Sequence, residues 1–81
     1  MMHLCGIQDM RLTHLSGYIV TVDMDHLHDN IGRASSFANA SKECNADKSC
    51  RGFNSGGWYK RVASPVRTSK GMCFYTKGSS R

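Results

Sequence analysis

The chain has 81 residues, a formal net charge of +5 and a sequence pI of about 9.3. A chain of this length is expected to form one domain, residues 1–81. Folding of such a chain buries only about 60 to 65% of its unfolded surface, so the core alone gives marginal stability and a cross-link such as a disulfide is expected. Residues 1–7 lack the basic leader and apolar run of a secretory signal, and no segment is apolar enough to span a bilayer.

The first predicted strand covers residues 18–22, a β-branched and aromatic run with the sequence YIVTV. Residues 23–32, where Asp, His and Asn are crowded together, are predicted to form a loop that ends in a turn. This loop is a weak candidate for a metal site, because an extended backbone would place its carboxylates and imidazoles on opposite faces. We expect a solvated acidic loop and no bound metal. The titratable residues concerned are Asp23, Asp25, His26, His28 and Asp29.

A short amphipathic helix is predicted to begin after Ser35 or Ser36 and to end near Asn45. Its apolar residues fall at helical spacing and form one stripe. The helix also contains a glycosylation sequon that begins at Asn39, which matters only on a eukaryotic secretory route. The residues of the apolar stripe are Phe37, Ala40 and Cys44.

Two short aromatic segments, residues 51–54 and 58–62, flank the sequence SGG and are predicted to form a hairpin or a bent strand pair. Residues 63–71, which include Pro65, lack apolar periodicity and are predicted to be a mobile or ligand-facing loop. A last strand is expected at residues 72–76. The tail, residues 78–81, is expected to fray.

The four cysteines, Cys5, Cys44, Cys50 and Cys73, are an even number in a short polar chain. This pattern favours a disulfide framework and an extracellular, oxidising compartment, and it permits three pairings. A zinc site is the main alternative, but the spacing from Cys44 to Cys50 is wider than that of usual zinc motifs, and no second close pair of Cys or His follows. A cytosolic protein with reduced thiols is a further alternative if the native chain begins at Met1. We expect no cofactor.

Residues 44–53 read CNADKSCRGF, so that two cysteines enclose a five-residue polar loop between the predicted helix and a predicted strand. Together with DNI at residues 29–31, Gly57-Trp58 and CFYTK at residues 73–77, this string resembles a PAN/apple domain over residues 17–77. The family occurs in secreted and adhesive proteins. The string at residues 44–53 is the specific part of the resemblance.

The resemblance implies an α+β fold, in which one short helix packs on a curved antiparallel sheet and disulfides staple the two. It implies a bond between Cys44 and Cys50. The family usually has another cysteine one helical turn earlier, paired with the late strand, but Ala40 occupies that position here. The resemblance therefore leaves Cys5 as the expected partner of Cys73. A bond from Cys44 to Cys73 would mean that the alignment is shifted by one turn.

Adjacent strand residues point to opposite faces, so one member of each adjacent aromatic pair is expected in the core. Tyr59 is exposed if Trp58 points inward, and Tyr75 is expected to point outward if Phe74 is inward. An exposed tyrosine among basic residues can stack on a sugar ring or a base while the cations hold an anionic group. The alternative is a tyrosine at a sheet surface with solvated lysines nearby.

The resemblance also implies a non-catalytic adhesion module, and the sequence contains no nucleophile elbow, phosphate loop or metalloprotease helix that would indicate an enzyme. Most of the positive charge lies in the C-terminal half, where it attracts anionic partners. We expect binding of a glycan or anionic polysaccharide outside the cell. The residues expected to contact this ligand are Asn54, Trp58, Tyr59, Lys60, Arg61, Arg67 and Lys70.

Two other functions remain open at this point. A protein-interaction module would use the same surface, with aromatic and arginine anchors. A basic cysteine-rich antimicrobial or nucleic-acid-binding peptide would explain the charge but leave the helix and strand pattern unexplained, so nucleic acid is not the expected partner.

Overall fold

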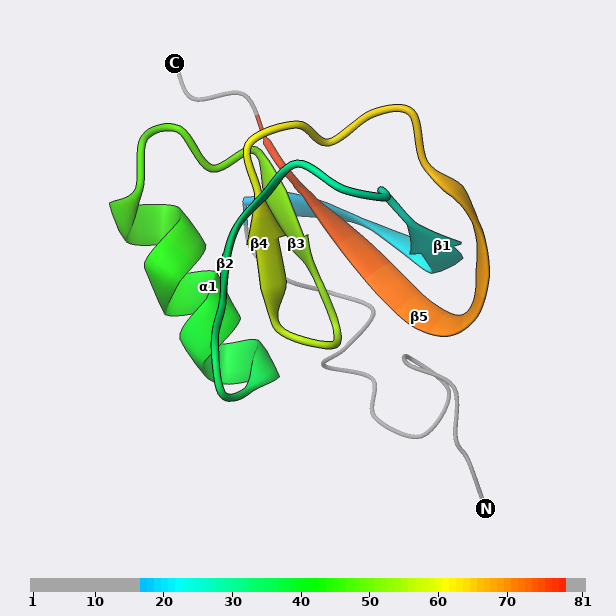
Figure 1. Ribbon diagram of the computed structural model, residues 1–81, viewed down its shortest axis with the longest axis horizontal. Coiled ribbons are helices and arrows are strands. Elements are labelled where there is room, and N and C mark those ends of the chain that lie inside the picture. The colour runs from blue at the N-terminus through cyan, green and yellow to red at the C-terminus, as the bar shows by residue number, and fades with distance from the viewer. Residues whose placement is uncertain (1–16, 79–81) are drawn as a thin grey trace.

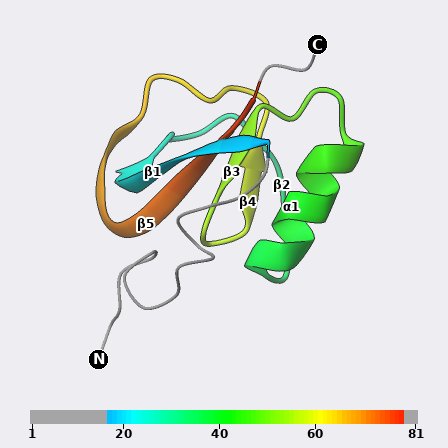
Figure 2. The same cartoon turned by 180° about the vertical axis from the view of Figure 1, so that it is seen from behind.

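In the computed structural model, which describes residues 17–78, one helix packs against a five-stranded antiparallel sheet (Figures 1 and 2). The strands lie in the order β1-β5-β3-β4-β2. This arrangement confirms the predicted α+β class. The elements are β1 (Tyr18–Asp25), β2 (Asn30–Arg33), α1 (Phe37–Ala46), β3 (Gly52–Asn54), β4 (Trp58–Lys60) and β5 (Arg67–Lys77).

The longest strand, β5, lies inside the sheet between β1 and β3. Tyr75 is paired with Val20 of β1 and with Phe53 of β3. The pairing of β1 with β5 is interrupted near Asp23, whose φ is +59°. There the Asp23 carboxylate accepts a hydrogen bond of 2.9 Å from the backbone N–H of Gly71, so the side chain bridges the irregularity and the two strands continue beyond it.

Helix α1 begins as predicted, because the Ser36 hydroxyl accepts a hydrogen bond from the N–H of Asn39. Ala40 and Cys44 are fully buried, which confirms the predicted apolar stripe, whereas Asn39 is exposed. The Cys44–Cys50 disulfide is present and ties the end of the helix to the start of β3.

The second predicted disulfide would join Cys5 to Cys73. Cys73 is buried in β5, and Cys5 lies outside the described residues. This pairing therefore stays a prediction.

Residues 73–75 of β5 are buried on both faces of the strand, and this overturns one sequence-based expectation. On the helix side, Tyr75 stacks on Phe53 with ring centroids 4.8 Å apart, and Phe37 packs on both. On the other side, Phe74 is fully buried and packs near His26, with ring centroids 6.4 Å apart. Tyr75 was expected to point outward, but a strand that is buried on both faces has no outward position for it.

The two predicted loops are shorter than expected. Strand β1 continues to Asp25, where it pairs with Arg67, so β5 begins inside the segment predicted to be a mobile loop. Strand β2 begins at Asn30 by pairing with Lys60. These strand ends are polar, and they form because the partner strand supplies the hydrogen bonds, not because their own sequence favours strands. The predicted hairpin of β3 and β4 is confirmed.

The two ends of the described segment meet, since the N–H of Gly78 donates a hydrogen bond of 2.6 Å to the carbonyl oxygen of Gly17. Within residues 17–78, no helix has the length and apolar character needed to cross a membrane.

Gly52 is required by the close approach of β3 to β5. A Cβ atom at this position would lie 2.6 Å from the carbonyl oxygen of Tyr75 and 2.9 Å from the ring of Phe74. Because neither group can move without disturbing the sheet, we expect Gly52→Ala to lower the free energy of unfolding by about 2 kcal/mol or more. Denaturant unfolding measures the effect, with the exposed Thr68→Ala as control. A loss no larger than that of the control would contradict the tight approach.

Candidate functional site

Asn54 holds the hairpin and β1 together through its side-chain amide. Its Nδ2 donates to the carboxylate of Asp25 at 3.0 Å, and its Oδ1 accepts from the N–H groups of Gly56 at 3.0 Å and Trp58 at 3.1 Å. The residue is 2% exposed. Asn54 was expected to contact a ligand, but it is buried and its amide is already bonded, so its role is structural.

Lys60 is also buried, although it was expected to hold a ligand. Its ammonium donates to Oδ1 of Asn30 at 2.7 Å and to the carbonyl oxygen of His28 at 3.2 Å. Burial lowers the pKa of the Lys60 ammonium, and the nearby carboxylates of Asp25 and Asp29 partly offset this effect. The Lys60 ammonium points toward the β1–β2 connection and holds it by these hydrogen bonds, so Lys60 is not available to a ligand.

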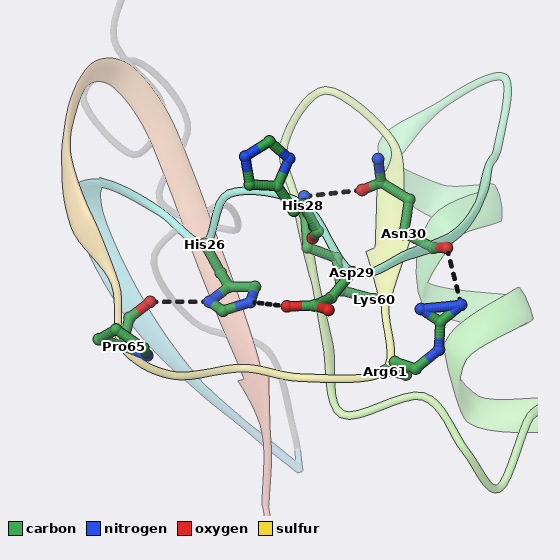
Figure 3. A network of polar contacts seen from close by, with 7 residues as sticks. All are labelled: His26, His28, Asp29, Asn30, Lys60, Arg61 and Pro65. Atoms are coloured by element: carbon green, nitrogen blue, oxygen red, sulfur yellow. Dashed lines mark hydrogen bonds and ion pairs between the residues drawn. The ribbon is translucent and has the colours of Figure 1, made fainter.

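His26 joins two connections that are distant in sequence (Figure 3). Its Nδ1 lies 2.7 Å from the carbonyl oxygen of Pro65, and its Nε2 lies 2.7 Å from the carboxylate of Asp29. The carbonyl and the carboxylate both accept hydrogen bonds, and the His26 ring lies between them. The hydrogen bond from His26 lowers the pKa of Asp29, and the positive charges of His26, Arg61 and His28 add to this effect. The acidic loop was expected to be solvated, but Asp25 and His26 are buried.

The same network fixes the start of the β4–β5 connection, residues 61–66. The N–H of Arg61 donates to the carbonyl oxygen of Asp29 at 3.0 Å, and its guanidinium reaches the carbonyl oxygen of Asn30 at 3.4 Å. His28 and Asp29 have φ values of +68° and +61°, so two consecutive residues adopt a left-handed conformation. These turns direct the backbone carbonyl groups of residues 28–30 toward Lys60 and Arg61.

A pocket of about 310 Å³ opens beside this connection, and we call it the basic pocket. Its lining includes three cations and two hydroxyl groups but no carboxylate. It can therefore attract an anionic group by charge and hold it by hydrogen bonds. The lining residues are Arg51, Arg61, Val62, Ala63, Ser64, Thr76 and Lys77.

The central strands fix the positions of two of these cations. The N–H of Arg51 donates to the carbonyl oxygen of Lys60, and the carbonyl oxygen of Arg51 accepts from the N–H of Lys77, both at 2.7 Å. The ammonium of Lys77 donates to the carbonyl oxygens of Cys44 at 2.6 Å and Asp47 at 3.2 Å. An ammonium has three donors, so one remains for a ligand. The Arg51 guanidinium is exposed and has no hydrogen bond to a described residue.

The exposed aromatic residue of β4 is Trp58, not Tyr59. Tyr59 packs against the core, next to Gly32, whereas Trp58 is 38% exposed and has the guanidinium of Arg33 5.4 Å from its ring centre. The predicted tyrosine platform is therefore absent at this position, and a tryptophan with a stacked arginine lies on the opposite face of the strand.

The structure separates the remaining predicted contact residues. Arg67 is exposed at the start of β5 and lines a second pocket, while Lys70 is exposed and lines neither pocket. Of the seven predicted contact residues, the basic pocket contains only Arg61. Arg51 and Lys77 belong to the positively charged C-terminal half of the chain, but no sequence pattern pairs them. They meet because of the register between β3 and β5.

Within residues 17–78, no group of three or more His, Cys, Asp or Glu residues is arranged to hold a metal ion. Comparison of the chain with protein-family models, curated proteins and solved structures gave no match.

The lowered pKa of Asp29 predicts a pH-dependent contribution to stability. A carboxyl group whose pKa is lower in the folded state stabilises the fold above its unfolded value, here 3.8, and loses that contribution as the pH falls through the folded value. Asp29→Asn should therefore destabilise the protein at pH 7, and the difference from the native chain should shrink below about pH 4. Denaturant unfolding across this range measures it, with the exposed Glu43→Gln as control. A difference that does not change with pH would contradict the role given to the His26 contact.

The buried Asn54 amide predicts a large effect on stability. Asn54→Ala leaves the Asp25 carboxylate and the two turn N–H groups without this partner. We expect the free energy of unfolding to fall by about 3 kcal/mol, because each buried group left unpaired costs about 1 to 3 kcal/mol. Thermal or denaturant unfolding measures the loss, and the exposed Asn39→Ala is the matched control. If both variants lose the same free energy of unfolding, the Asn54 amide does not hold the hairpin and β1 together.

Proposed function

We propose that the protein is a non-catalytic, PAN/apple-like module that binds acidic glycans outside the cell. The observation that carries the proposal is the basic pocket, in which Arg51, Arg61 and Lys77 converge without a carboxylate. Its volume of about 310 Å³ is at the lower end of ligand pockets, about 300 to 1,000 Å³, and suits a single sugar unit with its acidic group. The planar fork of an arginine matches a carboxylate or a sulfate group.

Three further observations support this proposal. The Cys44–Cys50 disulfide is consistent with an oxidising, extracellular compartment. The string at residues 44–53 and the helix-on-sheet arrangement agree with the PAN/apple resemblance. Both ring nitrogens of the buried His26 lie within hydrogen-bond distance of protein oxygen atoms, those of Pro65 and Asp29, so this residue is not placed to act on a substrate.

Arg61→Gln tests the proposal, since Arg61 is exposed and its replacement leaves the backbone contact with Asp29 in place. Isothermal titration would compare dextran sulfate and polygalacturonate with neutral dextran. We expect the acidic glycans to bind and the substitution to weaken them about tenfold, the effect of losing one charge-assisted hydrogen bond.

Lys42→Gln is the control for net charge, because Lys42 is exposed on α1 and does not line the basic pocket. It should change the affinity less than twofold. Equal losses in the two variants would reduce the binding to nonspecific attraction between polyions. The absence of binding to either acidic glycan would overturn the proposal.

A protein-interaction module is the second candidate, and one observation favours it. The exposed Trp58 with Arg33 stacked beside it combines two residue types that dominate protein interfaces. If attachment of the protein to extracellular matrix is weakened by Trp58→Ala and unaffected by Arg61→Gln, this second function is supported and glycan binding is not.

A further inference from the structure

A second pocket, of about 250 Å³, lies between the β1–β2 connection and the end of the β4–β5 connection. We call it the side pocket. Its lining residues are His26, Leu27, His28, Pro65 and Arg67. Like the basic pocket, it contains a cation and no carboxylate, and a part of its wall is apolar.

The two pockets share the β4–β5 connection in their walls. Ser64 lines the basic pocket and Pro65 lines the side pocket, and these residues are consecutive in the chain. Consecutive Cα atoms are no more than about 3.8 Å apart, so one short connection contributes to the walls of both pockets. The bond from His26 to the carbonyl oxygen of Pro65 holds the connection in place between them.

The side pocket has the chemistry of a sugar subsite. Leu27 is 48% exposed, and together with Pro65 it offers an apolar wall for the face of a sugar ring. The His28 ring points away from the polar network (Figure 3), and it has no hydrogen bond to a described residue. The exposed Arg67 supplies one charged fork for an acidic group. The consecutive left-handed residues His28 and Asp29 carry strain of the kind that often marks binding loops.

We propose that the basic pocket and the side pocket together bind one acidic oligosaccharide, with one acidic group at Arg61 and another acidic group of the same chain at Arg67. The inference rests on the proposed function and deepens it, because it names the ligand as a chain with more than one acidic group and not as a single charged sugar. Two linked contacts raise the affinity for a chain well above that for either unit, since the second contact forms within the complex.

Chondroitin sulfate oligosaccharides test the inference, because successive sugars in them carry a carboxylate and a sulfate. Isothermal titration would compare the di-, tetra- and hexasaccharide. We expect the native protein to bind the tetrasaccharide at least tenfold more tightly than the disaccharide. Arg67→Gln should reduce this gain to less than threefold and leave the disaccharide affinity within twofold. Arg61→Gln should weaken the disaccharide itself.

Lys70→Gln is the matched control, because Lys70 is an exposed cation on the same strand as Arg67 and lines neither pocket. It should preserve the tenfold gain. If Arg61→Gln weakens binding and Arg67→Gln has no more effect than Lys70→Gln, the two-pocket inference is wrong and the proposed function stands. If none of the oligosaccharides binds, both are overturned.

Discussion

Burial of residues 73–75 of β5 on both faces is the constraint on which the rest of the structure depends. One face is closed by α1 through an aromatic cluster, in which Tyr75 stacks on Phe53. The opposite face is closed instead by the β1–β2 and β4–β5 connections, whose polar groups surround Lys60 and His26. Every buried side-chain nitrogen or oxygen of the described residues has a hydrogen-bond partner, so this polar layer is complete.

The polar layer also holds in place the loops that form much of the candidate site. The backbone of Arg61 is held by the carbonyl group of Asp29, and Pro65 is held by His26. The strands fix Arg51 and Lys77 from the other side. Asp29 and His26 thus hold residues of this connection in position, which fits the general need for support behind a candidate binding surface.

The sequence predicts the regular parts of the fold and only one member of the basic pocket. The run at residues 18–22, the N-cap at Ser36 and the hairpin are local signals, and all three are found in the structure. The prediction that Tyr75 points outward was wrong, because the alternation of side chains between the two faces of a strand indicates exposure only where one face is open to solvent. The prediction that Lys60 contacts a ligand failed, because its ammonium is bonded to oxygen atoms of His28 and Asn30, which are 32 and 30 residues away in the sequence. Arg51 and Lys77 lie next to each other because of the strand register, which no local sequence pattern specifies.

The hydrogen bond between Gly17 and Gly78 closes the described segment at a single point. The two ends of the described segment therefore lie side by side. A host protein could accommodate such a unit within one of its surface loops, because an insertion with adjacent ends needs almost no separation of the host residues that flank it.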